Sequence, residues 1–308
     1  MSAREVASRT GWSASTISRE LRRNRVKQCY RHDEAQQLAE QRRRLASRRP
    51  HKLTEEVSAY VISCLQAGWS PEQTEGRLRR EGRLPVISHE SIYRMVWSDK
   101  HNGGVLYKHL RHKAKKYNKR SKQKVGRGII EGRVDISQRP IGVAAKGRLG
   151  DWELDTVVSS KTNSAAVVSM VDRCSKLVRF VKVSAKTADA VSQAIINRLS
   201  ERKCIVRTLT SDNGKEFAGH KKISKALGAA FYFATPYHSW ERGLNEHTNG
   251  LLRQYFPKKT DFSTVTEKQL QHVENLLNNR PRSVLNFKTP NEVFYTALRF
   301  SPGVALQN

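Results

Sequence analysis

Cysteine and long apolar runs are two features that this sequence mostly lacks. Its four cysteines lie far apart and form no Cys-x-x-Cys pair. This spacing argues against a disulfide framework or a zinc knuckle and suits a reducing cytosol. No apolar run approaches the roughly 18 residues of a membrane span, and no signal-peptide pattern opens the chain. We therefore expect a cytoplasmic protein without a membrane partner.

Acidic residues are also scarce. The 308 residues carry 57 Lys and Arg against 28 Asp and Glu, a net charge of +29 at pH 7. Residues 1–150 hold +20 of this excess, and residues 151–308 hold +9. Such a surface favours an acidic polymer as its partner, because neutralised phosphates release counterions. The first half is therefore predicted to be the main DNA-holding part of a chain long enough for two or three domains.

Three carboxylates stand in three different local settings within residues 155–246. Asp155 lies in a strand-like run in which apolar residues alternate, so its side chain points away from the apolar face. Asp212 follows a β-branched run and precedes an Asn-Gly turn, which predicts a position where a strand ends. Glu246 lies among apolar residues at helical spacing, on a neighbouring face of the predicted helix.

This set of carboxylates favours a metal site. Three ionised carboxylates brought together repel one another unless a cation lies among them. Oxygen ligands without Cys or His favour Mg²⁺ or Mn²⁺ over zinc. Two such ions roughly 3.5–4 Å apart can stabilise both the attacking and the leaving oxygen of an in-line displacement at phosphorus. The set therefore predicts phosphodiester chemistry.

The spacing and the surrounding residues make the set recognisable. Asp155 and Asp212 have 56 residues between them, and Asp212 and Glu246 have 33. The surrounding segments are GDWELD at 150–155, TSDNGKEF at 210–217, PYHSWERG at 236–243 and NEHTNGL at 245–251. In this order they resemble the DDE integrase core of bacterial transposases of the insertion sequence 30 family. Leu154 stands where the family usually has Gly, and His247 stands where it usually has Asn, but neither change removes a carboxylate.

The resemblance implies a fold, a reaction and a set of site residues. The implied fold is the ribonuclease-H-like integrase core, an α/β mixed sheet flanked by helices, preceded by all-α helix-turn-helix DNA-binding domains. The implied reaction is metal-dependent cleavage and strand transfer at the inverted-repeat ends of an insertion sequence. Asp155, Asp212 and Glu246 would be the catalytic residues and would bind two Mg²⁺ or Mn²⁺ ions. Core residues expected to position the DNA backbone are Lys215, Asn245, Asn249 and Arg253.

The resemblance also implies partners and a location. The expected substrate is double-stranded DNA, both the element ends and the target. Synapsis of two ends makes a homo-oligomer reasonable, and a bacterial transposase is expected to act at the nucleoid.

Residues 4–24 are predicted to form a helix, a turn and a second helix. Gly11 suits the turn, and Ser13 is the expected N-cap. The second helix would present a polar face to a major groove, and this segment resembles the family's N-terminal DNA-binding segment. The DNA contacts expected there are Ser15, Ser18, Arg19, Arg22 and Arg23. Family members usually carry a further helix before this point, so we expect a truncated domain; an ordinary solvated helix face is the alternative.

A second helix-turn-helix-like unit is predicted within residues 50–110. At Ser70 the chain has an N-cap residue, then Pro, then Gln three residues after the cap, which is typical of a helix start. A second start follows at Ser88. The segments around both starts resemble the family's second helix-turn-helix, so Ser88 and His89 are expected to contact the element's ends. A purely structural helical domain is the alternative.

Basic residues crowd into residues 111–127 without any acid. Because like charges repel there and little can be buried, the block is predicted to be a linker that orders on DNA. We place the linker at 111–140, between the helical units at 1–49 and 50–110 and the catalytic core at 141–308. Its expected DNA contacts are Lys115, Lys116, Lys119 and Arg120.

The core is predicted to be a mixed sheet with a crossover helix. The expected strands lie near 150–159, 165–172, 177–184, 205–211 and 230–235, and the expected helices lie near 187–201, 220–227 and Glu246. A cap, Pro and acid pattern beginning at Thr289 predicts the last helix.

Two alternatives stay open. Each neighbouring acid, Glu153, Asp172, Glu216 and Glu241, more commonly serves solvation, capping or ion pairing than catalysis. A DNA-binding regulator whose core has lost activity would share the same sequence features, and a ribonuclease-H-type nuclease would share the core. Metal-dependent nicking of DNA that contains an element end distinguishes these functions, whereas DNA binding does not.

Overall fold

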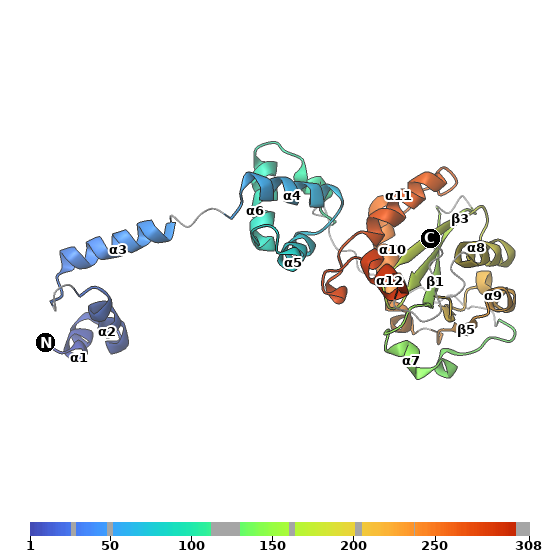
Figure 1. Ribbon diagram of the computed structural model, residues 1–308, viewed down its shortest axis with the longest axis horizontal. Coiled ribbons are helices and arrows are strands. Elements are labelled where there is room, and N and C mark those ends of the chain that lie inside the picture. Colours follow the sequence, from blue (N-terminus) through green and yellow to red (C-terminus); the bar gives the residue numbers. More distant parts are fainter. Residues whose placement is uncertain are drawn as a thin grey trace. The chain divides into compact units, whose positions relative to one another are not determined.

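The computed structural model describes residues 1–25, 29–47, 52–111, 130–159, 164–200, 205–236 and 238–299. The chain divides into two compact units, Met1–Thr54 and Glu55–Asn308 (Figure 1). None of the helices in the described ranges is long and apolar enough to cross a membrane. The four-part domain division drawn from the sequence stays a prediction.

The first unit consists of α1 (Ala3–Thr10), α2 (Ala14–Arg23) and α3 (His32–Ser47). Helix α1 ends at Gly11, whose φ of 73° is a left-handed conformation that favours glycine. Helix α2 begins at Ser13, whose hydroxyl accepts a backbone N–H of the first turn. The predicted helix, turn and second helix, with their Ser13 cap, are confirmed.

Three helices open the second unit, namely α4 (Glu55–Gln66), α5 (Pro71–Glu81) and α6 (His89–His101), followed by η1 (Leu106–His109). The predicted helix start at Ser70 is confirmed: its hydroxyl accepts the Gln73 N–H, and the Gln73 side chain accepts the Ser70 N–H. Ser88 caps α6 in the same way through the Ser91 N–H. Both starts follow from local hydrogen bonding, which the sequence expresses directly.

A five-stranded sheet forms the centre of the second unit. Its strands are β1 (Asp151–Val158), β2 (Ala166–Asp172), β3 (Val178–Val183), β4 (Thr208–Ser211) and β5 (Ala230–Phe233). Their spatial order is β3-β2-β1-β4-β5, with β1, β2 and β3 antiparallel and with β4 and β5 parallel to β1. This mixed sheet with flanking helices confirms the predicted fold class.

Helices cover both faces of the sheet. They are α7 (Ile141–Ala144), α8 (Ala188–Ser200), α9 (His220–Leu227), α10 (Gly243–Tyr255), α11 (Glu267–Asn278) and α12 (Pro290–Arg299), with the short η2 (Ile136–Gln138), η4 (Lys215–Phe217), η5 (Ser239–Arg242) and η6 (Ser283–Leu285). Figure 1 shows α8 and α9 on one side of the sheet and α10 and α11 on the other.

Strand alternation divides the core into two clusters. Trp152 and Leu154 of β1 belong to the cluster that contains residues of α8 and α9. Val157 belongs to the cluster that contains Leu251 of α10 and residues of α11. Because successive side chains alternate, Asp155 shares the face of Val157 and therefore looks toward α10.

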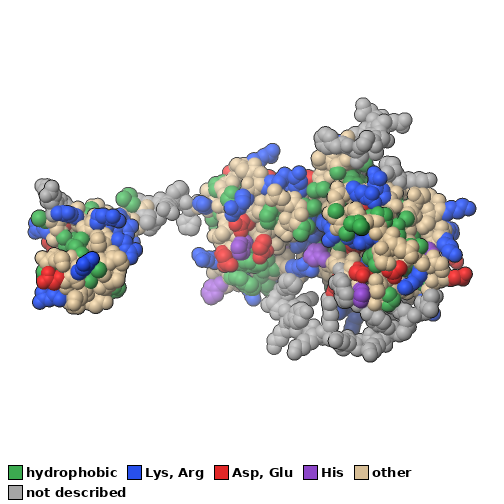
Figure 2. Space-filling view, turned by 90° about the horizontal axis from the view of Figure 1, so that it is seen from below, with side chains coloured by type: hydrophobic (Ala, Val, Ile, Leu, Met, Phe, Trp, Pro, Cys, Tyr) green, Lys and Arg blue, Asp and Glu red, His purple; other side chains and the backbone are tan. Residues whose placement is uncertain are grey.

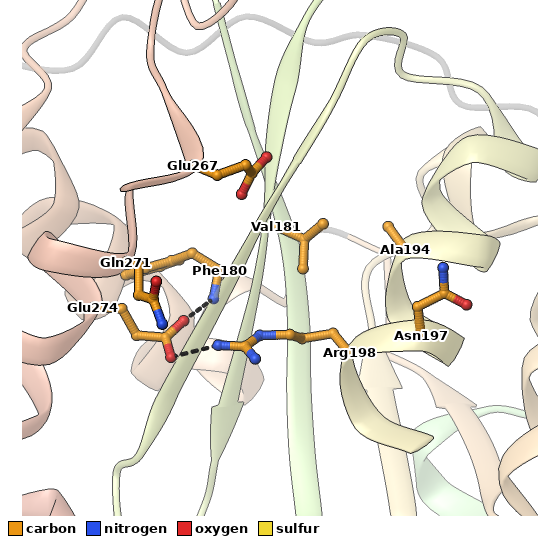
Figure 3. Close-up of a pocket in the computed structure, with 8 residues that line it drawn as sticks. All are labelled: Phe180, Val181, Ala194, Asn197, Arg198, Glu267, Gln271 and Glu274. Atoms are coloured by element: carbon orange, nitrogen blue, oxygen red, sulfur yellow. Dashed lines mark hydrogen bonds and ion pairs between the residues drawn. The ribbon is translucent and has the colours of Figure 1, made fainter. Parts of the chain in front are cut away.

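Helix α11 closes the free edge of β3 with side chains instead of a further strand. The Asn278 side chain accepts the Val178 N–H at 2.8 Å and donates to the Val178 carbonyl at 3.0 Å. One turn earlier, Glu274 accepts the Phe180 N–H at 2.8 Å and pairs with Arg198 of α8 at 2.7 Å (Figure 3). Phe180, Arg198 and Glu274 line a cavity of about 330 Å³. The hydrogen bonds from β3 to Asn278 and Glu274 satisfy an edge that would otherwise offer unpaired backbone groups.

Candidate active site

Asp155 and Asp212 come together because of the register between β1 and β4. The two strands are parallel, with Glu153 paired to Thr210. Strand β4 ends at Ser211, and the same register extended by two residues places Asp155 beside Asp212. Two neighbouring parallel strands therefore deliver both aspartates to one place.

The guanidinium of Arg242 lies between the two aspartates. Its Nη2 is 3.2 Å from Oδ1 of Asp155, and its Nη1 is 3.6 Å from Oδ2 of Asp212. Nη2 also donates to the carbonyl oxygen of Leu154 at 2.9 Å, which ties the guanidinium to β1. The two carboxylates are thus arranged to share one positive charge, as a bridging cation would require.

Helix α10 holds the second oxygen of Asp155. Nδ2 of Asn249 donates to Oδ2 of Asp155 at 2.7 Å, and Oδ1 of Asn249 accepts from Oγ of Ser169 at 3.0 Å. Ser169 is the register partner of Asp155 on β2. The carboxylate is therefore oriented by groups from β2 and α10 as well as by Arg242.

The electrostatics of the pair favour a cation. Burial raises the pKa of Asp155; the charge of Arg242 opposes this shift, and the negative charge of Asp212 adds to it. Asp212 is oriented by its own turn, because the Gly214 N–H donates to its Oδ1 at 3.0 Å. A hard divalent cation suits two such carboxylate oxygens and would displace any proton that burial favours.

Glu246 stands apart from the aspartate pair. It lies in the first turn of α10 and is exposed, three residues before Asn249. Within the part of the chain that the structure describes, no group of three or more Asp, Glu, His or Cys side chains could hold a metal ion. The structure therefore brings two of the three predicted ligands together and places the third on the helix that contacts them.

Comparison with known proteins decides the family. The integrase core domain model matches residues 146–239. The transposase for insertion sequence element IS4351 of Bacteroides fragilis is 46% identical over 296 residues, 96% of this chain and 90% of that protein. The transposase InsI for insertion sequence element IS30A of Escherichia coli (strain K12) is 36% identical over 306 residues, 95% of this chain and 78% of that protein. The chain belongs to the insertion sequence 30 family of DDE transposases.

Two further findings complete the comparison. The solved catalytic core domain of BIV integrase aligns with 48% of this chain and 95% of its own, at 25% identity and with a TM-score of 0.39. The matched integrase core contains Asp155 and Asp212 and ends before Glu246. The family prediction made from the motifs is confirmed.

The neighbouring acids of this transposase have structural partners. Glu153 forms a buried ion pair with Arg173, with Oε1 and Nη1 2.5 Å apart. Backbone N–H groups donate to Asp172 and to Glu241, at 2.9 Å and 2.8 Å respectively. Glu216 pairs with the amine of Lys186 at 2.8 Å. Each of these acids therefore has a structural partner, and Glu153 and Glu216 have the ion-pair role that was their alternative in the sequence.

The DNA contacts predicted on α2 share one property: all are exposed. They are Ser15, Ser18, Arg19, Arg22 and Arg23. Figure 2 shows Lys and Arg side chains spread over the visible face of the first unit. Their spacing of three and four residues places them along one side of the helix. Contact between these residues and DNA stays a prediction.

The two contacts predicted at the start of α6 already have protein partners. The Ser88 hydroxyl caps the helix. The His89 ring Nδ1 lies 2.7 Å from Oε2 of Glu75, and this hydrogen bond is the main reason why the pKa of His89 is raised. A contact with DNA would have to use the exposed part of each side chain, and it stays a prediction.

The contacts predicted in the core differ in accessibility. Lys215 is exposed three residues after Asp212. Asn245 is buried, whereas Arg253 donates to the carbonyl oxygen of Val158 at 2.7 Å and so ties α10 to β1. The remaining predicted contacts, Lys115, Lys116, Lys119 and Arg120, lie outside the described residues.

Arg242 is the site residue that sequence reasoning missed. It stands within the recognised segment 236–243, and nothing in its spacing distinguishes it from an ordinary surface arginine. Its role depends on the parallel register of β1 and β4, which a linear pattern does not express. The available signal was the need for a cation among clustered acids.

Proposed function

We propose that this transposase cuts DNA at the ends of its insertion sequence and joins the freed 3′ end to target DNA. Asp155, Asp212 and Glu246 would hold two Mg²⁺ or Mn²⁺ ions at the site. The observation that carries the proposal is the convergence of Asp155 and Asp212 on one cationic group, Arg242. Bound ions would supply an activated water and charge stabilisation at the leaving oxygen.

The side chains around the ions have separate tasks in this proposal. Asn249 fixes Oδ2 of Asp155, while Oδ1 faces Arg242, which also contacts Asp212. Arg242 holds the two aspartates together, and its guanidinium can also bind an oxygen of a phosphate brought to the same place. Glu246, in the first turn of α10, would be the third carboxylate of the set. No covalent bond between the enzyme and DNA is required.

The helical segments would bring the DNA to this site. The exposed polar face of α2 and the start of α6 would bind the element's inverted repeats. The named relatives are transposases of bacterial insertion sequences, which supports action on nucleoid DNA in the cytoplasm. Cutting two ends together would require two or more copies of the chain.

Cleavage of a labelled duplex that carries an element end tests the proposal. The full chain is incubated with this duplex in Mg²⁺ or in Ca²⁺, and strand cleavage is expected only in Mg²⁺. Binding without cleavage in Mg²⁺ would favour the inactive regulator instead. Equal cleavage of an RNA–DNA hybrid without an end sequence would favour a nuclease of the ribonuclease H type.

A further inference from the structure

Two arginines beside α10 are buried and have no carboxylate partner among the residues that the structure describes. Arg280 and Arg282 are 2% and 7% exposed. Arg280 donates to the amide oxygens of Gln73 and Gln254, at 2.9 Å and 3.0 Å, and Arg282 donates to the carbonyl oxygen of Leu277 at 3.1 Å. All three acceptors are neutral. Nε of Arg282 is buried and has no hydrogen-bond partner among the described residues.

Two other buried or half-buried arginines in the same unit have acidic partners. Arg173 faces Glu153, and Arg179 faces Glu274, in ion pairs of 2.5 Å and 2.8 Å. A charge removed from water is costly unless an opposite charge compensates for it. Among the described residues, Arg280 and Arg282 therefore lack the acidic partner that Arg173 and Arg179 have.

Several observations indicate an accumulation of positive charge at this place. Burial lowers the pKa of Arg282 to about 10, and the charges of Arg280 and Arg111 contribute in the same direction. The buried hydroxyl of Tyr255 also lacks a partner within the described residues. An anion here would meet both guanidinium charge and a free O–H donor.

Arg111 reaches α10 at Gly250. This residue is exposed, and a Cβ added to it would lie 3.3 Å from Nη2 of Arg111. The missing side chain leaves room for the Arg111 guanidinium to lie against the helix. Gly250 follows Glu246 by four residues, which is about 6 Å along a helix axis. Successive phosphates of one DNA strand are spaced about 3.4 Å along the duplex axis, so a strand at Glu246 also reaches Arg111.

We propose that Arg280 and Arg282, with Arg111 at the rim, bind a backbone phosphate of the DNA strand whose neighbouring phosphodiester is held by Asp155, Asp212 and Glu246. The inference rests on the proposed function, since it takes the strand to be the one in the catalytic site. The phosphate supplies the negative charge that no described carboxylate provides beside these arginines. It also fixes how far the strand extends along α10.

Substitution of Arg282 by methionine gives effects of opposite sign on stability and on binding. Arg282→Met removes an uncompensated buried charge and keeps an apolar side chain of similar length. The melting temperature of the free full-length chain should therefore stay the same or rise. Binding of the end duplex in Ca²⁺ should weaken about tenfold at 0.1 M salt. The slope of log K against log salt concentration should fall by about 0.9, the value for one phosphate contact.

Arg207→Met is the matched control. Arg207 is exposed and directly precedes β4, and Asp212 directly follows β4. The control therefore removes one positive charge at the end of β4 that lies away from Asp212. It should change the affinity less than twofold. Inorganic phosphate provides a second readout. It should raise the melting temperature of the wild type and of Arg207→Met, and it should raise the melting temperature of Arg282→Met much less.

Two outcomes would overturn the inference. A lower melting temperature with unchanged DNA affinity and salt slope would make Arg282 purely structural. Unchanged DNA affinity with an altered oligomeric state would assign the arginines to an acidic protein surface. Both readouts are independent of strand cleavage, so a wild type that fails to cut DNA contradicts the proposed function without deciding this question.

Discussion

Arg77 of α5 and Glu292 of α12 form a bidentate ion pair. Nη1 and Nη2 of Arg77 lie 2.8 Å and 2.7 Å from the two carboxylate oxygens of Glu292. The same glutamate caps α12 by accepting the Thr289 N–H at 2.7 Å. The last helix of the described residues is thus attached to the helical segment that precedes the sheet, and a single carboxylate serves both the cap and the attachment.

The Arg77–Glu292 pair should give the free energy of unfolding a defined pH dependence. The hydrogen bonds from Arg77 lower the pKa of Glu292 from 4.5 to about 2. Because the pKa of Glu292 is lower in the folded state, the ionised carboxylate stabilises the protein at pH values above the unfolded-state pKa. This stabilisation is lost as the pH falls toward 2. Wild type and Glu292→Gln should therefore differ in melting temperature by a constant amount above about pH 5, and the difference should shrink below it. Glu56→Gln, at an exposed glutamate of α4, serves as control.

Loss of one aspartate of the site should abolish cutting and spare binding. Asp212→Asn keeps the size of the side chain and its turn hydrogen bond, but removes the charge that a divalent cation needs. Cleavage of the end duplex in Mg²⁺ should fall by about 10³-fold or more, which corresponds to about 4 kcal/mol. DNA affinity in Ca²⁺ should change less than threefold, and exposed Asp189→Asn should change neither. Parallel loss of binding would make Asp212 a structural residue.

The sequence predicted the fold well because its signals are local. The caps at Ser13, Ser70 and Ser88 each depend on residues within one turn, and all three lie where the pattern placed them. The strands follow from β-branched runs ended by turn residues, and the predicted boundaries agree with the structure within about three residues. Helix α11 was not predicted, although Thr266 and Gln269 form a capping box at its start.

The site was predictable only in part, because its geometry depends on register between distant segments. Motif order selected Asp155, Asp212 and Glu246. Their distances depend on how β1 pairs with β4 and on how α10 packs on the sheet. The bridging role of Arg242 and the burial of Arg282 arise only when these segments meet. A pattern read along the sequence does not show which distant residues come into contact.

Asn249 should affect the metal requirement more than the fold. It orients Asp155 by donating to Oδ2, so Asn249→Ala should free that carboxylate to rotate toward Arg242. Side chains that orient a ligand typically contribute about 10–100-fold to metal affinity. The Mg²⁺ concentration for half-maximal cleavage should rise by that factor, while the melting temperature stays close to that of the wild type. The control Asn197→Ala, on α8, should leave the Mg²⁺ requirement unchanged, and an unchanged requirement in Asn249→Ala would contradict the orienting role.

Glu274 should be among the acids on which the stability of the sheet depends most. It is 2% exposed and binds Arg179, Arg198 and the Phe180 N–H at once. Removing one partner of a buried ion pair typically costs about 3–5 kcal/mol, because the other charge stays buried. Glu274→Ala should lower the free energy of unfolding by about that amount in urea denaturation. Gln271→Ala, at an exposed residue of the same cavity, should change it by less than about 0.5 kcal/mol. A loss of similar size in both variants would show that the cavity wall as a whole, rather than the carboxylate, holds the edge of β3.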